Sequence, residues 1–344
     1  MSSKKILYLG NIPTSHPKSI GGLTTIALEV YTFLKNKNLN IEQKQIRSFW
    51  KPKWQLIDYF FWIFKAPFVF RKFDIIMIFG SLDFNFTIAP VVWIWAKLLR
   101  KKIVYQISGG IFHDKFEKLD PIRKYLLKKT ILKSDYFFAE TKSIINYFKS
   151  LGYENMIWLP NSRPVYEGNL PEKKYSKKFV FVSRVTQNKG IDEIVEAFSK
   201  LSENYQVDLY GPLDNKFYHK DFFKKYKNIH YKGLIEPEKV RDKLTEYDFL
   251  LLPTFHPGEG YPGIIIESFS VALPVITTNW RSIPDIVKHD YNGFLIEPKN
   301  SEELLELIKS IDNPKYLRLR RNALKSFSNF DKNIVYQKFI KALK

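Results

Sequence analysis

Gly258-Glu259-Gly260-Tyr261-Pro262-Gly263-Ile264-Ile265-Ile266-Glu267 joins a loop rich in glycine and proline to an apolar run. Proline suits the first turn of a helix, so we expect a short, nearly all-apolar helix over residues 264–272. The free amides and positive dipole end at its start would attract an anion. Glu259 lies just before the helix and Glu267 about one turn inside it, where both can accept hydrogen bonds from hydroxyls. The stretch therefore predicts a site for an anion flanked by hydroxyls, as in a sugar nucleotide. An ordinary loop with two capping or surface glutamates is the alternative.

The composition is that of a folded protein with room for two cores. The chain has 344 residues, of which 45% are hydrophobic and 16% aromatic, so we expect two domains of roughly 150 to 180 residues each. There is no cysteine, which excludes disulfides and thiolate metal sites and fits a reducing compartment. The apolar run after the basic first residues is too short for a signal peptide. We therefore expect a cytoplasmic protein.

The positive charge is concentrated in the first half of the chain. Of the formal net charge of +20, residues 1–170 carry +14, from 26 Lys and Arg against 12 Asp and Glu. Such an excess indicates an acidic partner, such as phospholipid headgroups, nucleic acid or a phosphorylated substrate. No nucleic-acid recognition motif appears and the charge forms no single stripe, so we expect no nucleic-acid partner. A polyanion-binding protein remains the alternative from another functional class.

The N-terminal half begins with the first unit of a doubly wound α/β domain. A strand is expected over residues 4–10, and Gly21-Gly22 opens a helix over residues 23–34. The glycines do not match the G-x-G-x-x-G dinucleotide fingerprint. They would nevertheless allow the backbone around Gly22 to approach a phosphate closely, although ordinary turn glycines explain them equally well.

Two further segments are dense in apolar residues, residues 54–70 and 84–99. Neither is expected to span a bilayer: charged residues and Pro67 interrupt the first, and the uncharged part of the second covers only roughly 20 Å. We interpret the second as a core helix. Basic residues flank the first, which favours a surface at a membrane interface over a plain buried helix. These residues are Lys51, Lys53, Arg71 and Lys72.

Polar residues follow the strand expected over residues 103–107, and a strand end in an open α/β sheet is where ligands bind. Ser108 and Gly109, with His113 shortly after them, are therefore candidates for a ligand site. A helix expected over residues 121–134 carries five Lys and Arg spread around its axis, so a solvated helix explains them as well as a membrane patch does. Those residues are Arg123, Lys124, Lys128, Lys129 and Lys133.

The α/β pattern repeats after a segment rich in Gly, Pro and Lys, a composition typical of a linker. We expect an N-terminal domain over residues 1–165, a linker over 166–178 and a C-terminal domain over 179–328. Residues 329–344 are expected to form a last helix that can cross back to the N-terminal domain.

Several motifs of the second half share an order and spacing with a known family. They are Val182-Ser183-Arg184 with Lys189-Gly190-Ile191-Asp192, the stretch from Glu259 to Glu267, Leu273-Pro274-Val275-Ile276, Pro284-Asp285-Ile286-Val287 and Asn292-Gly293-Phe294-Leu295-Ile296. This set resembles the retaining glycosyltransferases of family four, which build capsule, O-antigen and lipid-linked sugars in bacteria. The first half matches only through its Gly21-Gly22 loop, its strand rhythm and the loop at Asn161. The resemblance implies an α/β protein of GT-B fold, with two Rossmann-like domains whose parallel sheets face an interdomain cleft.

The resemblance also implies roles for individual residues. Arg184 and Lys189 would bind the diphosphate and neutralise the leaving group, although both could otherwise be ordinary surface charges. Glu259 would bind the hydroxyls of the donor sugar, Glu267 those of the ribose. The catalytic candidates are thus Arg184, Lys189 and Glu259. The remaining donor-binding candidates are Gly22, Ser183, Gly233, Leu234, Gly260, Tyr261, Gly263, Ile264 and Glu267, and the acceptor-side candidates are Ser108, Gly109, His113 and Asn161.

The implied chemistry needs neither a carboxylate nucleophile nor a metal. The resemblance suggests front-face displacement, in which the departing phosphate takes the acceptor's proton, in place of the paired carboxylates of hydrolases. The nearest string to a metal-binding Asp-x-Asp is Asp83-Phe84-Asn85, which lacks the second acid, and six scattered His form no ligand spacing. We therefore expect no metal and no cofactor.

The sequence departs from the family at two places. Ser108-Gly109-Gly110 stands where many relatives have a His. Ala272 stands where Gly is usual, and a left-handed backbone there would make Ala costly.

The sequence thus predicts a cytoplasmic retaining glycosyltransferase, peripheral on the inner face of the membrane. It would move a hexose-type sugar from a UDP- or GDP-linked donor to a lipid-linked or polysaccharide acceptor in cell-surface glycan synthesis. The acceptor and the anionic membrane surface are predicted from the charged, aromatic first half. A phosphorylase or hydrolase on the same fold is a further alternative.

Overall fold

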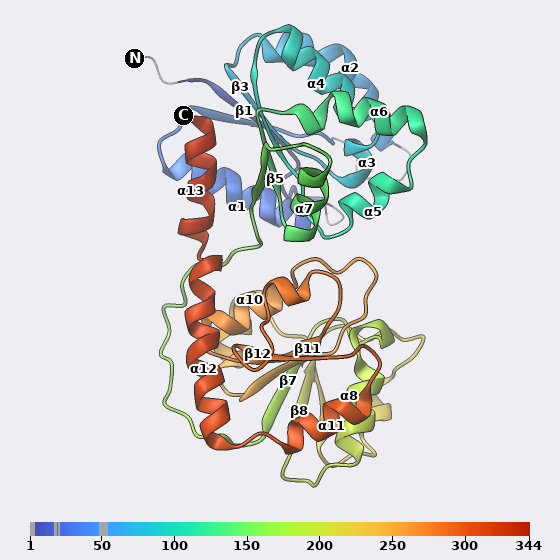
Figure 1. Cartoon of the computed structure of the whole chain (residues 1–344), viewed down its shortest axis with the longest axis vertical. Coiled ribbons are helices and arrows are strands. Elements are labelled where there is room, and N and C mark those ends of the chain that lie inside the picture. The colour runs from blue at the N-terminus through green and yellow to red at the C-terminus, as the bar shows by residue number, and fades with distance from the viewer. Residues whose placement is uncertain (1–3, 17–18, 20, 48–53) are drawn as a thin grey trace. The chain divides into compact units, whose positions relative to one another are not determined.

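The computed structural model describes residues 4–16, 19, 21–47 and 54–344. Contacts divide the chain into two compact units, unit 1 (Met1–Pro160 and Tyr336–Lys344) and unit 2 (Asn161–Val335). Each unit contains a six-stranded sheet in which every pair of neighbouring strands is parallel, with helices packed on it (Figure 1). The predicted pair of parallel α/β sheets is confirmed.

The sheet of unit 1 has the strand order β2-β1-β3-β4-β5-β6. Its short, polar edge strand β2 follows the first helix and has too little apolar pattern to be predicted from the sequence. The strands are β1 (Ile6–Gly10), β2 (Ile41–Lys44), β3 (Ile75–Phe79), β4 (Lys102–Gln106), β5 (Tyr136–Ala139) and β6 (Met156–Trp158). The helices are α1 (Gly22–Asn36), α2 (Gln55–Phe70), α3 (Leu82–Asn85), α4 (Ala89–Leu98), α5 (Phe112–Glu117), α6 (Pro121–Lys129), α7 (Lys142–Ser150) and the part of α13 (Lys332–Leu343) from Tyr336 onward.

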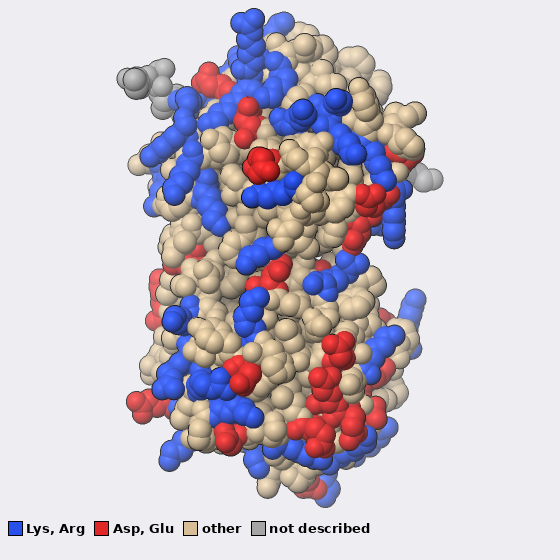
Figure 2. All heavy atoms as spheres, in the orientation of Figure 1, with Lys and Arg blue, Asp and Glu red and all other residues tan. Residues whose placement is uncertain are grey.

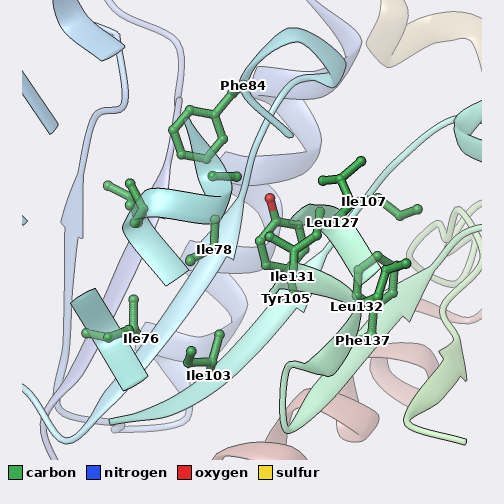
Figure 3. Close-up of a cluster of buried hydrophobic side chains, with 14 of the residues drawn as sticks. Ile76, Ile78, Phe84, Ile103, Tyr105, Ile107, Leu127, Ile131, Leu132 and Phe137 are labelled. Atoms are coloured by element: carbon green, nitrogen blue, oxygen red, sulfur yellow. The ribbon is translucent and has the colours of Figure 1, made fainter. Parts of the chain in front are cut away.

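Alternate residues along these strands point to opposite faces of the sheet, as the two-residue repeat of a strand requires. On one face, Ile76, Ile78 and Tyr105 belong to a buried cluster (Figure 3). Side chains from α2, α4, α5, α6 and α7 also belong to this cluster. The Tyr105 hydroxyl is satisfied there because it donates to Asn85 Oδ1 at 2.7 Å. On the other face, Phe138 packs edge-on against Phe339 of α13. Unit 1 is therefore a three-layer sandwich with a mostly aromatic and aliphatic core.

The sheet of unit 2 has the order β12-β11-β10-β7-β8-β9. Helices α8 and α11 pack together, and so do α10 and α12. The strands are β7 (Lys178–Val182), β8 (Gln206–Tyr210), β9 (Ile229–Gly233), β10 (Phe249–Leu252), β11 (Val275–Thr278) and β12 (Gly293–Ile296). The helices are α8 (Ile191–Ser199), α9 (Val240–Leu244), α10 (Gly263–Ser270), α11 (Ser301–Lys309) and α12 (Asn313–Phe327). The helix expected over residues 264–272 is thus present as α10.

In each sheet the chain adds strands first toward one edge and then, from a single point, toward the other edge. In unit 2 the chain runs from β7 outward to β9 and then returns to β10, which pairs with the other side of β7. In unit 1 the same reversal falls between β1 and β3. Ligands of open α/β sheets bind beyond the carboxyl ends of the strands at such a switch point. The topology therefore directs attention to the loops after β7 and β10 in unit 2.

Two helices differ from the sequence prediction. The helix expected over residues 121–134 ends at Lys129, since Thr130 leaves helical backbone and its Oγ1 donates to Leu126 O at 2.6 Å. The helix expected over residues 84–99 is two helices, α3 and α4. Ser81 caps the first by accepting from the Phe84 amide, and Pro90 lies in the first turn of the second. Local capping chemistry decides both breaks.

The apolar segment over residues 54–70 combines both of its expected environments. Tyr59, Trp62 and Phe70 are buried in the core of unit 1, whereas Phe60, Phe64 and Phe68 are exposed. In the described part of the chain, no helix has both the length and the apolar character needed to cross a bilayer. Lys51 and Lys53 lie outside the described residues.

Candidate functional site

Two of the predicted catalytic residues meet at the switch point of unit 2. Lys189 follows β7, Glu259 follows β10, and Lys189 Nζ donates to Glu259 Oε2 at 2.5 Å. Thr254 Oγ1 donates to the same oxygen at 2.8 Å, and Glu259 is only 8% exposed. The carboxylate therefore has a fixed orientation, and the ammonium group lies where an anion at the strand ends would meet it.

Glycine 190 allows the two loops to approach each other. Its φ is +83°, and a Cβ there would lie 2.3 Å from the Pro253 carbonyl oxygen. The Phe255 amide donates to the Asn188 carbonyl at 3.0 Å, and Thr254 Oγ1 lies 3.2 Å from the same oxygen. Only glycine fits this position, because both the backbone angle and the space exclude a side chain. The loop that carries Lys189 is thus hydrogen-bonded directly to the loop that carries Glu259.

Arg184 is exposed beside this pair, on a turn held by a second glycine. A Cβ on Gly211 would lie 1.8 Å from the Ser183 carbonyl oxygen, so the turn at Ser183 requires glycine opposite it. His256 lies in the same loop, between Thr254 and Glu259. Burial lowers the pKa of its ring, and the positive charges of Lys189 and Arg184 lower that pKa further, whereas the negative charge of Glu259 raises it. Lys189, Arg184 and Glu259 therefore all lie close enough to His256 to affect its protonation.

The second predicted carboxylate is paired with a residue that the sequence did not single out. Arg163 Nε donates to Glu267 Oε1 at 2.7 Å, and both side chains are largely buried. The Arg163 guanidinium also lies over the first turn of α10, since a Cβ on Gly263 would come within 2.4 Å of Nη2. The half-buried Gly260, Gly263 and Ile264 thus surround the helix N-terminus beside a cation, which is a favourable place for a phosphate.

The remaining donor-side candidates divide into structural and exposed positions. Tyr261 is 2% exposed; its hydroxyl donates to Asp285 Oδ2, and its carbonyl accepts from Asn161 Nδ2, both at 2.8 Å. These contacts hold the loop before α10. Gly233, with φ +84°, ends β9, and Leu234 after it is strongly exposed. They lie two strands from β7, at the same carboxyl edge of the sheet.

On unit 1, the acceptor-side candidates Ser108 and Gly109 share one partner. Ser108 Oγ and the Gly109 amide donate to Glu140 Oε2 at 2.9 and 2.7 Å. Glu140 is buried directly after β5, the neighbour of β4, so its position after a strand could have indicated it. His113 Nε2 lies 3.3 Å from Asp114 Oδ1. Gly22 begins α1, and no heavy atom of the described residues lies within 4 Å of a Cβ placed there.

Within the described ranges, no group of three or more His, Cys, Asp or Glu side chains is arranged to hold a metal ion. The groups that the unit 2 site does offer are two ion pairs, an exposed Arg184 and the first-turn amides of α10. This set can bind a diphosphate through its cations and amides while its carboxylates accept from hydroxyls.

The family comparison covers this same region. Residues 162–326 match the family described as "Glycosyl transferases group 1". This segment belongs to the group 1 glycosyltransferases. The match includes the loops after β7 and β10, α10 and Arg163.

Curated relatives align with this chain over more residues than the family match covers. The N,N'-diacetylbacillosaminyl-diphospho-undecaprenol alpha-1,3-N-acetylgalactosaminyltransferase of Campylobacter jejuni is 22% identical over 270 residues, 72% of this chain and 71% of the relative. The capsular polysaccharide biosynthesis glycosyltransferase CapM of Staphylococcus aureus is 28% identical over 188 residues, 50% of this chain. The chain spans only 48% of that second relative's length.

Among solved structures, the complex of Anabaena HepE with UDP has a similar fold along the whole chain. The TM-score is 0.73 at 17% identity, and the match covers 98% of this chain and 99% of HepE. The chain therefore has the GT-B fold that its motifs implied.

Proposed function

We propose that this chain is a retaining glycosyltransferase that moves a hexose-type sugar from a UDP- or GDP-linked donor to a lipid-linked or polysaccharide acceptor. The Lys189–Glu259 pair at the unit 2 switch point carries this proposal. Residues 179–328 would bind the nucleotide sugar and residues 1–165 the acceptor. The relatives' names support the biosynthetic context: one acts on a diphospho-undecaprenol-linked sugar and the other in capsular polysaccharide biosynthesis.

Donor binding would exchange the partners of both ion pairs. Without a ligand, Lys189 neutralises Glu259 and Arg163 neutralises Glu267. A nucleotide sugar supplies phosphate oxygens for the cations and hydroxyls for the carboxylates, so each group keeps a hydrogen-bonding partner. Glu259 would then bind the donor sugar and Glu267 the ribose.

Arg184 and Lys189 would supply the main catalytic effect. The bond to the diphosphate breaks with negative charge growing on the leaving phosphate, and preoriented cations stabilise that charge most in the transition state. Front-face displacement, with the phosphate taking the acceptor's proton, would retain the anomeric configuration. Since these cations take the place of a divalent ion on the diphosphate, transfer should continue in chelator. Complete loss in EDTA that Mg²⁺ restores would contradict this.

We further propose that the protein acts in the cytoplasm, peripherally on the inner face of the membrane. A lipid-linked acceptor would be presented there, and unit 1 holds 28 Lys and Arg against 11 Asp and Glu, a net charge of +17. Anionic lipid attracts such a protein to its surface.

Calorimetric titration of the purified protein with UDP, GDP, UMP and a short oligonucleotide tests the donor assignment. We expect one nucleoside diphosphate to bind at least about tenfold more tightly than UMP, which lacks the second phosphate, and the oligonucleotide not to compete with it. Lys189→Ala should lose this preference. Lys200→Ala is the matched control, since Lys200 pairs with Glu196 and Glu302 on the exposed surface.

Unchanged binding of the nucleoside diphosphate to Lys189→Ala would overturn the donor assignment. With the preferred donor identified, proton NMR of the first product formed tests the stereochemistry. An α-linked product from an α-linked donor supports retention, and a β-linked product contradicts it.

A further inference from the structure

Apart from Gln55, Asp58 and Lys65, every residue of helix α2 is apolar, yet the helix is buried on only one side. A helix of this kind is normally enclosed in a core. Here Tyr59, Trp62, Ala66 and Phe70 fill the core of unit 1, while the opposite side carries large exposed side chains over about half of the helix circumference, at roughly 100° per residue. These are Leu56, Ile57, Phe60, Phe61, Phe64 and Phe68.

The exposure of these aromatic rings is substantial. Phe60, Phe64 and Phe68 are 58%, 59% and 67% exposed, and the rings of Phe60 and Phe64 contact each other edge-on with centroids 5.1 Å apart. Single exposed apolar residues are ordinary on protein surfaces, but a contiguous aromatic stripe marks a binding surface. Its one acidic residue, Asp58, is turned into the protein and buried.

The neighbouring helices extend this surface. Helices α2, α4 and α6 all pack on the same buried cluster, so they cover the same face of the unit 1 sheet, as Figure 1 shows. Their outward sides carry Ile94 and Leu98 on α4, and Ile122, Tyr125 and Leu126 on α6, all exposed. The spacings of three and four residues place each set on one side of its helix. We name the exposed apolar residues of α2, α4 and α6 the three-helix surface.

Cations accompany the three-helix surface. Lys65 lies over the ring of Trp62 and Arg71 over that of Phe68, at 5.4 and 5.8 Å from the ring centroids. At the end of α6, Lys128, Lys129 and Lys133 line a cavity of about 530 Å³ together with Tyr125. Figure 2 shows Lys and Arg side chains spread over the visible face of unit 1 among large uncharged areas. Aromatic rings beside cations are the composition of membrane-interface surfaces.

We propose that the three-helix surface docks unit 1 on a lipid bilayer whose headgroups are anionic. The aromatic rings of α2 enter the headgroup and upper acyl region, and the cations around them bind lipid phosphates. Helix α2 has 16 residues with Lys65 among its exposed side chains, so it lies along the bilayer surface. A second copy of this chain is a poorer occupant, because each unit 1 carries +17 and two such faces repel each other.

This docking surface deepens the proposed function, which places the acceptor on a lipid, but its test needs no donor. Flotation with vesicles of phosphatidylcholine alone, or mixed with phosphatidylglycerol, measures binding of the full chain directly. Nucleoside diphosphate binding, measured on the same preparations, reports the donor site separately. If the unaltered protein binds a nucleoside diphosphate but no anionic vesicles, the docking proposal is wrong and the donor assignment stands. If it binds the vesicles but no nucleoside diphosphate, the donor assignment is wrong and the docking proposal stands.

The main variant replaces the α2 aromatics, Phe60→Ser with Phe64→Ser and Phe68→Ser. We expect its affinity for anionic vesicles to fall on the order of 100-fold, since each ring loses apolar burial in the bilayer. The matched control replaces exposed apolar residues of unit 2, Phe217→Ser with Tyr291→Ser and Leu324→Ser, and should bind as the unaltered protein does.

A second variant, Arg71→Glu with Lys72→Glu, separates the charge contribution and keeps the test valid if the aromatic variant fails to fold. Binding to anionic vesicles should fall roughly tenfold or more, with no change on neutral vesicles. Equal vesicle binding by the unaltered protein and either variant would overturn the proposal. So would an unaltered protein that ignores vesicles but forms dimers that the aromatic variant loses, which would assign the surface to self-association.

Discussion

Units 1 and 2 share one architecture but differ in their net charge and in how their cations are paired. Unit 1 has 28 Lys and Arg against 11 Asp and Glu, and unit 2 has 27 against 24, so their net charges are +17 and +3. In unit 2 two of the site cations, Lys189 and Arg163, are paired with carboxylates at 2.5 and 2.7 Å. In unit 1 cations border exposed aromatic rings on α2.

The difference indicates two kinds of anion. A single diphosphate is bound best by a few preoriented groups, partly shielded from water, whose charge is balanced until the ligand arrives. An extended anionic surface needs no orientation, only many cations close to apolar side chains. We therefore expect single substitutions to matter greatly in unit 2 and little in unit 1.

The largest effect should follow removal of a unit 2 cation. Lys189→Ala and Arg184→Ala should each lower kcat about 10²- to 10³-fold, or roughly 2.7–4 kcal/mol, because each loses a charge contact that strengthens as the leaving group departs. Turnover with the preferred nucleotide sugar and a soluble acceptor measures this, with circular dichroism to verify folding.

Lys65→Ala is the corresponding unit 1 control and should retain the unaltered rate with a soluble acceptor, since Lys65 borders the α2 aromatics. Near-normal rates for both Lys189→Ala and Arg184→Ala would contradict the expectation that single substitutions matter greatly in unit 2. A strong loss of rate in Lys65→Ala would contradict the expectation that they matter little in unit 1.

A smaller effect is expected at the second ion pair. Arg163→Ala should weaken nucleoside diphosphate binding about tenfold, because Glu267 loses the charged hydrogen bond that orients it. Gly263→Ala should reproduce this loss, since its Cβ would come within 2.4 Å of Arg163 Nη2 and displace the guanidinium. Calorimetric titration gives both affinities.

The double variant Arg163→Ala with Gly263→Ala separates this interpretation from a direct clash with the ligand. If Gly263→Ala acts through Arg163, the double variant binds no more weakly than Arg163→Ala alone. Additive losses would show that Gly263 and Arg163 act independently.

The sequence predicted most of what depends on neighbouring residues. The β1 strand and the start of α10 lie where the first apolar run and the Pro262-Gly263 pair placed them, because local pattern and helix-start chemistry determine such elements. The prediction that Lys189 and Glu259 share a site drew on motif resemblance, and the structure brings them into contact.

Features that depend on distant contacts escaped prediction. Arg163 lies 104 positions before Glu267, in a loop with no periodic pattern, so only the folded chain reveals their pairing. For residues 54–70 the sequence favoured an interfacial surface, but it did not show which side of α2 is exposed, since the mostly apolar helix has no polar stripe to mark that side. Among the described residues, strand β2 pairs with β1 alone, and it has no buried residue.

The pKa of His256 offers a finer test of where the diphosphate binds. Burial and the charges of Lys189 and Arg184 hold this pKa below its ordinary value. In the interval between the lowered and ordinary values the unfolded chain binds the proton more strongly, so His256 makes the protein less stable as pH falls through that interval. A bound diphosphate should raise the pKa by offsetting the nearby positive charge.

NMR titration of the His256 ring, assigned with His256→Asn, measures this pKa with and without UDP or GDP. Lys189→Ala should raise the pKa in the free protein and reduce the further rise on nucleotide binding. A pKa that does not respond to the bound nucleotide would place the diphosphate away from the Lys189–Glu259 pair.

The smallest effect should be one of stability without chemistry, at the opposite end of α10 from the charges. Ala272 has φ +58°, and the Leu273 amide donates to the Ser268 carbonyl at 2.8 Å, the hydrogen bond of a helix end that favours glycine. Ala272→Gly should therefore stabilise unit 2 by about 1 kcal/mol, or about 2–4 °C in Tm, and leave turnover unchanged. Ala197→Gly in α8, where the backbone is helical and the methyl group buried, should shift Tm in the opposite direction. If Ala272→Gly altered turnover as well, the charged start of α10 would depend on strain at its end, and the paired charges of unit 2 would no longer explain its chemistry by themselves.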